Sequence, residues 1–266
     1  MFTNFPAWTR EAVPGQHGHF WAPDVIRVRD RYLLYYSVSS WGKNTSAIGP
    51  TTNLTLDPTA PTYRWTDAGI VIRSFATNNF NAIDPAVTLD SDGRLWLSFG
   101  SFWSGIKLVE LDPATGLRLA PDSPLHALAH HESTEAPCIH RHGEHYYLFV
   151  NWGLCCRGTN STYEIRVGHS RQITGPYLNQ AGKDLLSGGG SLLLGSRGAA
   201  IGPGHAGIVS GAGEDWLSFH YYGADNAGRP ALGRRKLHWD AAGWPLVDEP
   251  PAAPTGGSGE KGGETP

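Results

Sequence analysis

The chain has 266 residues, 40% of them hydrophobic and 17% charged, which is enough to bury a substantial core in one domain or in two small ones. Its 21 Lys and Arg residues are balanced by 24 Asp and Glu residues, and a net charge of -3 provides no broad basic surface for nucleic acid or an anionic membrane. No apolar run approaches the roughly 20 residues that cross a bilayer, so we expect no spanning helix.

Aromatic residues and glycine are abundant. The chain has 10 Trp, 10 Tyr and 9 Phe residues beside 34 Gly and 19 Pro. This mixture is typical of many short strands joined by tight turns, and flat rings of this kind stack on sugars. The composition therefore favours an all-β protein that handles carbohydrate.

The N-terminal segment carries few signals. Residues 1–10 have no basic region followed by an apolar one, so no signal peptide is visible. Residues 2–19 contain the segments PAW and AVP, which are typical of an outer strand. We interpret residues 2–19 as the end of a first sheet.

Four later segments follow one plan, in which a short stretch with Pro or Gly leads through a turn into an aromatic-rich strand. The segments begin with residues 20–28, 81–89, 134–142 and 202–210. They recur every 51 to 70 residues, which is long enough for a four-stranded antiparallel sheet. Hairpin turns at this interval predict a β-propeller, with a β-sandwich of coincidental spacing as the alternative.

The spacing inside each module is nearly constant. It is 19 residues for Ala22 to Trp41 and for Asp84 to Trp103, and 17 residues for Glu135 to Trp152 and for His205 to Tyr222. The first strand of each propeller blade lines the central channel. We therefore predict that Asp84, Glu135 and His205 converge on one axis beside Trp21.

The C-terminal part supplies the remaining elements. Residues 63–72 and 236–247 are expected to contribute outer strands. From Glu249 the chain is rich in Pro, Gly and Glu without periodic apolar positions. Residues 249–266 are therefore predicted to be a disordered tail after a propeller domain of residues 1–248.

The cysteines Cys138, Cys155 and Cys156 are odd in number and do not predict a disulfide framework. Adjacent cysteines rarely bond to each other, because the ring would need a strained peptide. We expect these residues to stay reduced and to pack as small apolar groups.

Motifs spread over residues 5–247 resemble the endo-1,5-α-L-arabinanases of glycoside hydrolase family 43. The matching motifs are FWAPDV (20–25), GKNTSAIG (42–49), NAIDPA (81–86), GSFWSGIKL (100–108), TEAP (134–137), NWGLCCRG (151–158), GPGH (202–205) and LHWDAAGWP (237–245). The resemblance implies a five-bladed β-propeller, of which four modules are recognisable here and the first blade is largely missing. It also implies an extracellular monomer that binds arabinan or arabino-oligosaccharides and hydrolyses α-1,5-L-arabinofuranosyl linkages.

The resemblance also implies catalytic roles. Family 43 enzymes invert the anomeric centre with a general base, a general acid and a carboxylate that tunes the acid. By motif match, Glu135 would be the general acid and Asp84 the residue that raises its pKa and orients it. This division agrees with electrostatics, because a neighbouring negative charge raises the pKa of a Glu. Taken singly, Asp84 could cap a turn before Pro85 and Glu135 could be a surface residue.

By the same resemblance, His205 corresponds to a channel His that helps to hold a hydrated ion, usually calcium, at the propeller axis. Calcium prefers oxygen ligands, so most of its shell would be water. The alternative is a His that is hydrogen-bonded in the channel without an ion.

The substrate contacts expected from the resemblance are mainly aromatic. Trp21, Trp41, Phe102 and Trp103 correspond to residues at blade edges that stack on arabinofuranose. Asn81 could bond a sugar hydroxyl. Core packing is the alternative role for each ring.

Other chemical motifs are set aside. Residues 202–207 match G-x-G-x-x-G, but a Pro interrupts the motif and a strand-like segment follows, which argues against a dinucleotide site. The His residues lack the spacing of a zinc finger, and G-x-S-x-G is absent from the sequence.

The general base is the departure from the family pattern. The family's base lies in a His-Asp-Pro-like motif near the mature N-terminus, and this sequence has none. Extrapolating the module interval backward from Ala22 places the motif before Met1. Asp24 is the nearest carboxylate, but the Asp of WAPD is structural in the family. We expect the base to be absent, because the sequence starts too late or, less favoured, because the chain is a natural remnant.

Three functions follow from this pattern. The leading hypothesis is an arabinan hydrolase that works with inversion. The first alternative is a non-catalytic arabinan-binding propeller that keeps Trp21, Trp41 and Trp103, and the second is a scaffold for protein partners. Endo and exo action are not distinguished, because they depend on loops that close one end of the channel.

Overall fold

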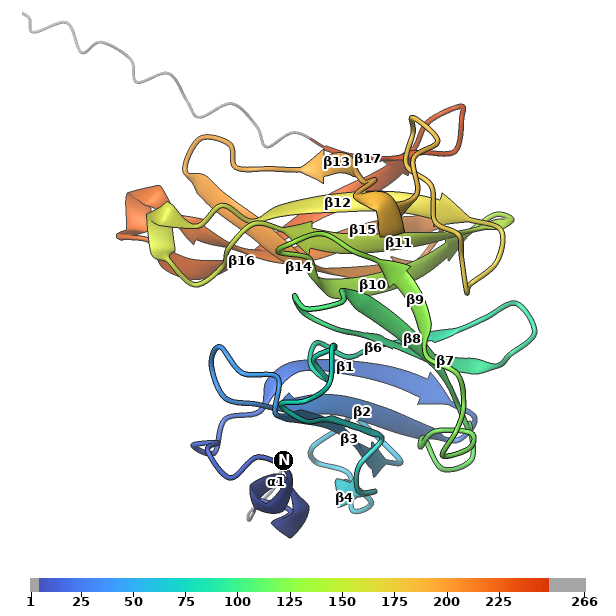
Figure 1. Ribbon diagram of the computed structural model, residues 1–266. Helices are drawn as coiled ribbons and strands as arrows, with labels where there is room; N and C mark the ends of the chain where they lie inside the picture. The colour runs from blue at the N-terminus through green and yellow to red at the C-terminus, as the bar shows by residue number, and fades with distance from the viewer. Residues whose placement is uncertain (1–4, 249–266) are drawn as a thin grey trace, which may run out of the picture.

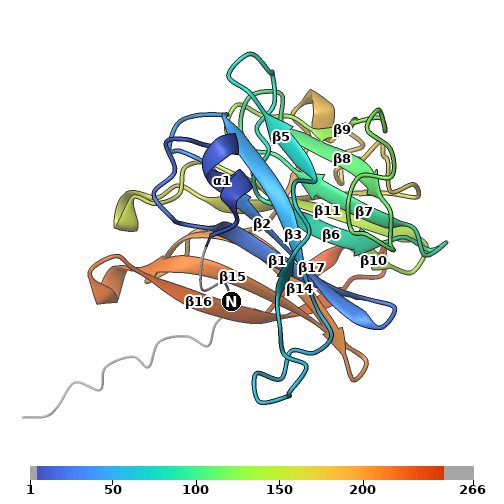
Figure 2. The same cartoon turned by 90° about the horizontal axis from the view of Figure 1, so that it is seen from below.

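The computed structural model describes residues 5–248, which form four antiparallel sheets in succession along the chain. The sheets follow one another around a common axis, with the first at the bottom of Figure 1, the second above it and the third and fourth overlapping in the upper part; Figure 2 shows the arrangement from below. This arrangement confirms the all-β propeller and its four modules. The predicted tail of residues 249–266 lies outside the described residues.

The first two sheets contain the N-terminal half of the propeller. The first sheet consists of β1 (Trp21–Val28), β2 (Arg31–Val38), β3 (Ser46–Asn53), β4 (Thr66–Asp67) and β5 (Ile72–Ser74), of which β4 and β5 both pair with β3. The second sheet consists of β6 (Ala86–Leu89), β7 (Leu95–Phe99), β8 (Ile106–Leu111) and β9 (His126–Ala129).

The last two sheets repeat the same order. The third consists of β10 (Glu135–His142), β11 (His145–Trp152), β12 (Glu164–Ser170) and β13 (Ser191–Leu194). The fourth consists of β14 (Ala200–Gly211), β15 (Glu214–Gly223), β16 (Arg229–Trp239) and β17 (Pro245–Val247). The expected outer strands in 63–72 and 236–247 are therefore present, although β4 and β5 are short.

The aromatic-rich strands become the second strand of each sheet, and those of the second and third sheets are buried on both faces, whereas β2 and β15 are buried only in part. In β7 every residue is buried, and in β11 every residue between the two ends is buried. A strand covered on both faces reads as a continuous apolar run, without the alternation of a half-exposed strand. This explains why the second strands are so easily recognised in the sequence.

Three hydrophobic clusters join neighbouring sheets. Tyr35 and Phe99 belong to the cluster between the first and second sheets, and Leu148 to the one between the second and third. Phe149 and Phe219 belong to the cluster between the third and fourth sheets. Each large side chain buried in this way stabilises the fold by about 1.5 to 3 kcal/mol before entropy costs.

The inner strands pack in the order β1, β6, β10 and β14, and so surround the axis. Within residues 5–248, β14 and β1 do not share an extended contact of the kind that joins the other neighbours. The fourth sheet also has the exposed apolar side chains Val209, Leu232 and Leu246.

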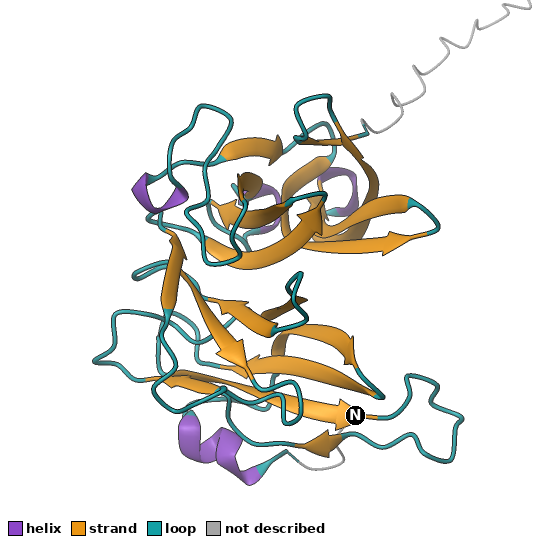
Figure 3. Cartoon of the chain, turned by 90° about the vertical axis from the view of Figure 1, so that its right-hand side faces the viewer, coloured by secondary structure: helices purple, strands orange, loops and turns teal. Residues whose placement is uncertain are grey.

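The structure corrects the expectation of an outer strand before residue 20. Residues 7–12 form the short helix α1 (Ala7–Ala12), shown in purple in Figure 3. Trp8 stacks on Tyr36, and its indole N–H donates to the carboxylate of Asp67 at 3.1 Å. Because the apolar residues pack on the first sheet from a helix, the pattern of PAW and AVP does not indicate a strand. No helix within the described range is long and apolar enough to span a membrane.

Candidate active site at one end of the propeller

The inner strand of every sheet is irregular at the same place. Ala22, Asp84, Ala136 and His205 all have a left-handed backbone, with φ values of 46°, 57°, 52° and 57°. Register shifts occur at this point in β1, β10 and β14. Such bulges re-aim side chains and are frequent next to active sites. The four modules therefore present equivalent irregular positions to one end of the channel.

This register corrects one detail of the module alignment. Ala136 occupies the position equivalent to Asp84, and Glu135 lies one residue earlier, in the row of Trp21 and Gly204. The spacing rule misaligns Glu135 because its aromatic end points are not equivalent: Trp152 is the last residue of β11, whereas Trp41 lies after the end of β2.

The structure brings Asp84 and Glu135 together. The backbone N–H of Ala136 donates to Asp84 Oδ2 at 3.2 Å, so the Asp84 carboxylate lies against the residue that follows Glu135. The Ser101 hydroxyl donates to Glu135 Oε2 at 2.6 Å. Both carboxyl groups are buried.

Burial and mutual repulsion favour a shared proton. Desolvation, followed by the negative charge of Asp84, raises the pKa of Glu135 to about 8, against the opposing hydrogen bond from Ser101. Desolvation raises the pKa of Asp84 to about 7, against the opposing Ala136 N–H. Two adjacent carboxyl groups titrate as a pair. We assign the proton to Glu135, because Asp84 accepts a backbone hydrogen bond that favours its charged form.

Asp24 and His205 form a second pair at the channel. Asp24 Oδ1 accepts the N–H of Val25 at 2.9 Å, and Oδ2 accepts the N–H of Val87 at 2.8 Å, which ties β1 to β6. Burial raises the pKa of Asp24, and these bonds and His205 oppose it. Burial lowers the pKa of His205, and Asp24 opposes that shift. Asp24 therefore holds two backbone segments together, in line with the structural role that the family resemblance implies.

The fit of a metal ion to this pair is limited. Among residues 5–248, no three His, Cys, Asp or Glu side chains gather closely enough to hold an ion. An ion beside His205 would take most of its ligands from water. The predicted calcium ion stays a prediction, and no chemical step is derived through it.

The predicted sugar-stacking residues lie at the same end of the sheets. Trp21 begins β1, and its ring lies 6.4 Å from that of Trp41, which follows β2 and is 74% exposed. Phe102 and Trp103 follow β7 with left-handed backbones, and Trp103 is 42% exposed. The exposure of Trp41 and Trp103 excludes core packing as the main role of these two rings.

Asn81 has a different environment. Its side chain is buried, and its Oδ1 accepts the Ser46 hydroxyl at 2.7 Å. Ser46 in turn is bonded to Ser39 at 2.8 Å. Asn81 therefore holds neighbouring segments together, and a direct sugar contact stays a prediction.

The expectation for two of the cysteines is wrong. Cys155 and Cys156 form a disulfide with each other, while Cys138 is free. They lie in the loop after β11, where Cys156 has a positive φ of 66° and its N–H donates to the Tyr222 hydroxyl at 2.8 Å. Adjacent side chains of an extended chain point to opposite sides. The left-handed backbone at Cys156 departs from that geometry, which the sequence does not reveal.

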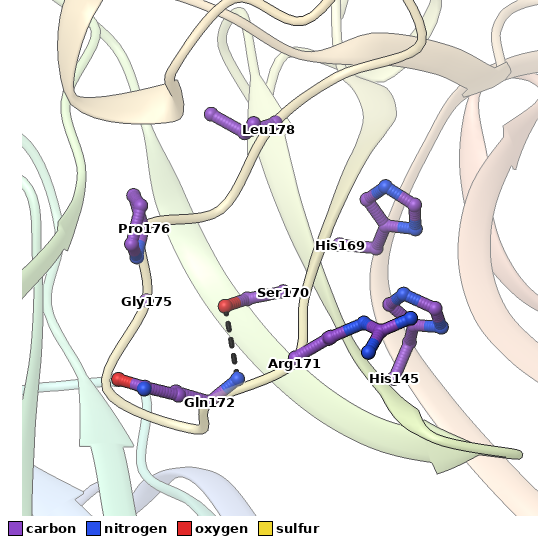
Figure 4. A pocket seen from close by; sticks show the side chains of 8 residues that line it. All are labelled: His145, His169, Ser170, Arg171, Gln172, Gly175, Pro176 and Leu178. Atoms are coloured by element: carbon purple, nitrogen blue, oxygen red, sulfur yellow. Dashed lines mark hydrogen bonds between the residues drawn. The ribbon is translucent and has the colours of Figure 1, made fainter.

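Two surface pockets lie at the opposite end of the propeller. One, of about 340 Å³, is lined by His145, His169, Arg171 and neighbouring residues, as Figure 4 shows. The other, of about 520 Å³, includes Asp90 and Trp96. His145 starts β11, whereas the active-site end is where β11 finishes, and eight strand residues span about 25 Å. Neither pocket belongs to the carboxylate site.

Three polar residues at the active-site end escape the sequence analysis: Ser37, Ser101 and Asn151. Ser37 accepts the N–H of Asp84 at 3.3 Å, and Asn151 Oδ1 accepts the N–H of His205 at 2.8 Å. All three are buried. The available signal is a polar residue within two residues of the end of an aromatic-rich strand.

A known protein family matches the part of the chain that contains these residues. The model of Glycosyl hydrolases family 43 matches residues 4–245. The chain belongs to glycoside hydrolase family 43. This match covers all four modules and includes Asp84, Glu135 and His205.

Two family 43 relatives cover most of the chain. An extracellular exo-α-(1→5)-L-arabinofuranosidase from Cellvibrio japonicus is 46% identical, over 93% of this chain and 75% of the relative. An extracellular endo-α-(1→5)-L-arabinanase from Bacillus subtilis is 43% identical, over 92% of this chain and 74% of the relative.

A solved family 43 structure has the same fold. The Cellvibrio cellulosa α-L-arabinanase complexed with arabinohexaose superposes with a TM-score of 0.89 and 44% identity. The match covers 93% of this chain and 82% of that one. The fold and the sequence therefore lead to the same family.

Proposed function

We propose that this chain acts on α-1,5-L-arabinofuranosyl linkages of arabinan, with Glu135 as general acid and Asp84 as the carboxylate that keeps Glu135 protonated. The observation that carries the proposal is the buried Asp84–Glu135 pair, in which the pKa of Glu135 is raised to about 8. The relatives named as an exo-α-(1→5)-L-arabinofuranosidase and an endo-α-(1→5)-L-arabinanase support the substrate class.

Glu135 would donate its proton to the glycosidic oxygen as the bond from C1 to that oxygen breaks. A general acid is effective when it is protonated at the working pH and its pKa is not far above that pH, and the raised pKa of Glu135 meets both conditions near neutrality. Asp84 would remain negative during this step and stabilise positive charge that develops on the sugar ring.

The identity of the general base is a separate question from that of the general acid. Inversion needs a base that lies about 6.5 to 9.5 Å from the acid, with a water between them. On the four inner strands, the carboxylates are Asp24 and Glu135, and both oxygens of Asp24 accept backbone N–H groups. We infer that residues 5–248 do not supply the base. The absence of a positioned base would lower the rate of hydrolysis roughly 10²- to 10⁴-fold.

The five-bladed form of the family fits this inference. The series of packed inner strands stays open between β14 and β1 within residues 5–248. A further blade at this place would cover exposed side chains of the fourth sheet such as Val209. It would also bring a fifth inner strand, with its own irregular position, between His205 of β14 and Ala22 of β1.

The substrate would lie across the active-site end. The exposed rings of Trp41 and Trp103 offer flat apolar faces to arabinofuranose units on either side of Glu135. One relative named above is an exo enzyme and the other an endo enzyme, so the mode of cleavage depends on features that differ between them. Since both relatives are named extracellular, we also propose that this protein is extracellular. That it is a monomer stays a prediction from the family resemblance.

Cleavage of debranched arabinan with and without sodium azide, measured by mass spectrometry of the shortened chains and of the glycosyl azide product, tests the proposal. Azide is a small anionic nucleophile that needs no base. It would attack C1, the C1–oxygen bond would break, and the proton of Glu135 would pass to the leaving oxygen. Calorimetric titration with arabino-oligosaccharides measures binding in parallel.

We expect slow cleavage that azide accelerates and that Glu135→Gln abolishes. Binding without cleavage under either condition would overturn the hydrolase and support the arabinan-binding alternative. Neither binding nor cleavage would overturn both and leave the scaffold hypothesis. Calcium titration in the same calorimeter, compared with His205→Ala, tests the proposed channel ion.

A further inference from the structure

A polar side chain at the end of each of the first three second strands reaches toward the next inner strand. These residues are Ser37 at the end of β2, Ser101 after β7 and Asn151 near the end of β11. Their partners lie 34 to 54 residues further along the chain, in the following sheet. A contact that recurs from sheet to sheet is a feature of the repeat and not an isolated coincidence.

The three contacts differ in what they hold. Ser37 and Asn151 accept backbone N–H groups, at Asp84 and His205, and therefore fix main-chain positions. The hydroxyl of Ser101 donates to the carboxyl group of Glu135 itself, at 2.6 Å from Oε2. Ser101 and Glu135 also form an isolated β-bridge, so backbone and side chain are joined at the same point.

We propose that Ser101 is a positioning residue for Glu135, whose carboxyl group it holds in one orientation with Oε1 free to carry the proton. The role rests on the proposed function of Glu135 as the general acid. A protonated carboxyl group has one accepting oxygen and one O–H. Because Ser101 donates to Oε2, that oxygen is the acceptor and the transferable proton lies on Oε1.

The direction of the effect follows from the groups around Glu135. Asp84 and burial raise its pKa, and the Ser101 hydroxyl lowers it, so the serine keeps the acid from binding its proton too tightly. An acid of excessive pKa is a poor proton donor in the transition state. Ser101 therefore opposes the effect of Asp84 on the pKa of Glu135 and also fixes the orientation of the Glu135 carboxyl group.

The test compares Ser101→Ala with Ser101→Thr and with a matched control, Ser98→Ala. Ser98 is also buried, lies three residues earlier, and bonds the carbonyl of Ala86 at 3.2 Å. Ser101→Thr keeps the hydroxyl. All three are measured by kcat and KM in the azide-assisted cleavage of arabinan and by the carbon-13 NMR titration of the Glu135 carboxyl group.

For Ser101→Ala we expect kcat to fall about tenfold, as for the loss of one hydrogen bond to an ionisable group, with KM within about twofold. The Glu135 titration moves to higher pH, and both changes are largely reversed in Ser101→Thr. A Glu135 titration unchanged from that of Ser98→Ala overturns the proposal, and so does an equal loss of kcat in both alanine variants.

The NMR titration reads Glu135 in the absence of turnover. A shifted titration in a chain whose cleavage does not depend on Glu135 would therefore leave the contact intact and remove the proposed function instead. If Ser101→Ala does not fold, Ser101→Gly and Ser101→Thr give the same comparison of a missing and a retained hydroxyl.

Discussion

Asp84 and Asp90 are both shielded from solvent, at 8% and 7% exposure, although Asp84 lies deeper in the protein, and they flank the short strand β6 at opposite ends. Asp90 accepts the backbone N–H groups of Asp92 and Arg94 and the side chains of Arg94 and Trp96, all within 2.9 Å. Asp84 accepts the N–H of Ala136 at 3.2 Å.

The two pKa values move in opposite directions. Burial raises the pKa of both, but at Asp90 the hydrogen bonds of Trp96, Arg94 and Asp92 outweigh burial and lower it. At Asp84 burial dominates. Burial alone does not make a catalytic carboxylate, because enough donors keep the charge stable and make the group structural. A carboxylate buried with few donors, beside a second carboxylate, shares a proton.

Replacing the proton donor is expected to have the largest effect at the Asp84 end. Glu135→Gln cannot donate the proton, so azide-assisted cleavage of arabinan should fall by on the order of 10³ or more. Glu132→Gln is the matched control, since Glu132 is exposed and three residues away. Comparable activity of the Glu135 variant and the control would contradict the assignment.

Asp84→Asn should reduce the same activity by on the order of 10². Without the negative charge, the pKa of Glu135 falls, so the alkaline limb of the pH–rate profile moves to lower pH. Asp90→Asn should leave both the rate and the profile unchanged. A similar shift in the Asp90 variant would break the contrast between the two ends.

Exposed apolar residues test which end of the second sheet binds the substrate. Trp41→Ala removes a stacking face near Asp84 and should raise KM for arabino-oligosaccharides about tenfold, with kcat changed little. Leu89→Ala, next to Asp90 and also partly exposed, should not change KM. Equal KM values in the two variants would argue that the substrate does not cross the Trp41 end.

The smallest effects concern stability and its dependence on pH. At Asp84 the folded-state pKa of about 7 lies above the ordinary 3.8, so stability is lost as the pH rises between these values. At Asp90 the folded-state pKa is lowered, so its stabilising effect is present above the unfolded pKa and disappears as the pH falls.

At pH 8, Asp84→Asn should therefore raise Tm by on the order of 3 °C, whereas Asp90→Asn should lower Tm. The difference should shrink at pH 4, where the wild-type Asp84 is protonated and Asp90 begins to take up a proton in the unfolded chain. Thermal unfolding followed by circular dichroism measures both variants. A loss of stability in the Asp84 variant at pH 8 would show that its carboxylate is structural after all.

Several features of the site could not be predicted from local sequence. The register that aligns Ala136 with Asp84 depends on bulges, and the pairing of Ser101 with Glu135 depends on how two sheets pack. Trp8 of helix α1 stacks on Tyr36, and this contact depends on the packing of the helix against the first sheet. The disulfide of Cys155 and Cys156 requires a left-handed backbone that no residue type nearby dictates.

The sequence by itself determined the four modules, the hairpin in each and the presence of Asp84, Glu135 and His205 near the start of successive inner strands, because strand periodicity and turn chemistry are local properties. The tertiary structure decided that Asp84 is buried with few donors while Asp90 has many, and that Ser101 reaches Glu135. Desolvation and hydrogen bonding between sheets depend on packing, so the charge state of each carboxyl group is fixed only when the sheets come together.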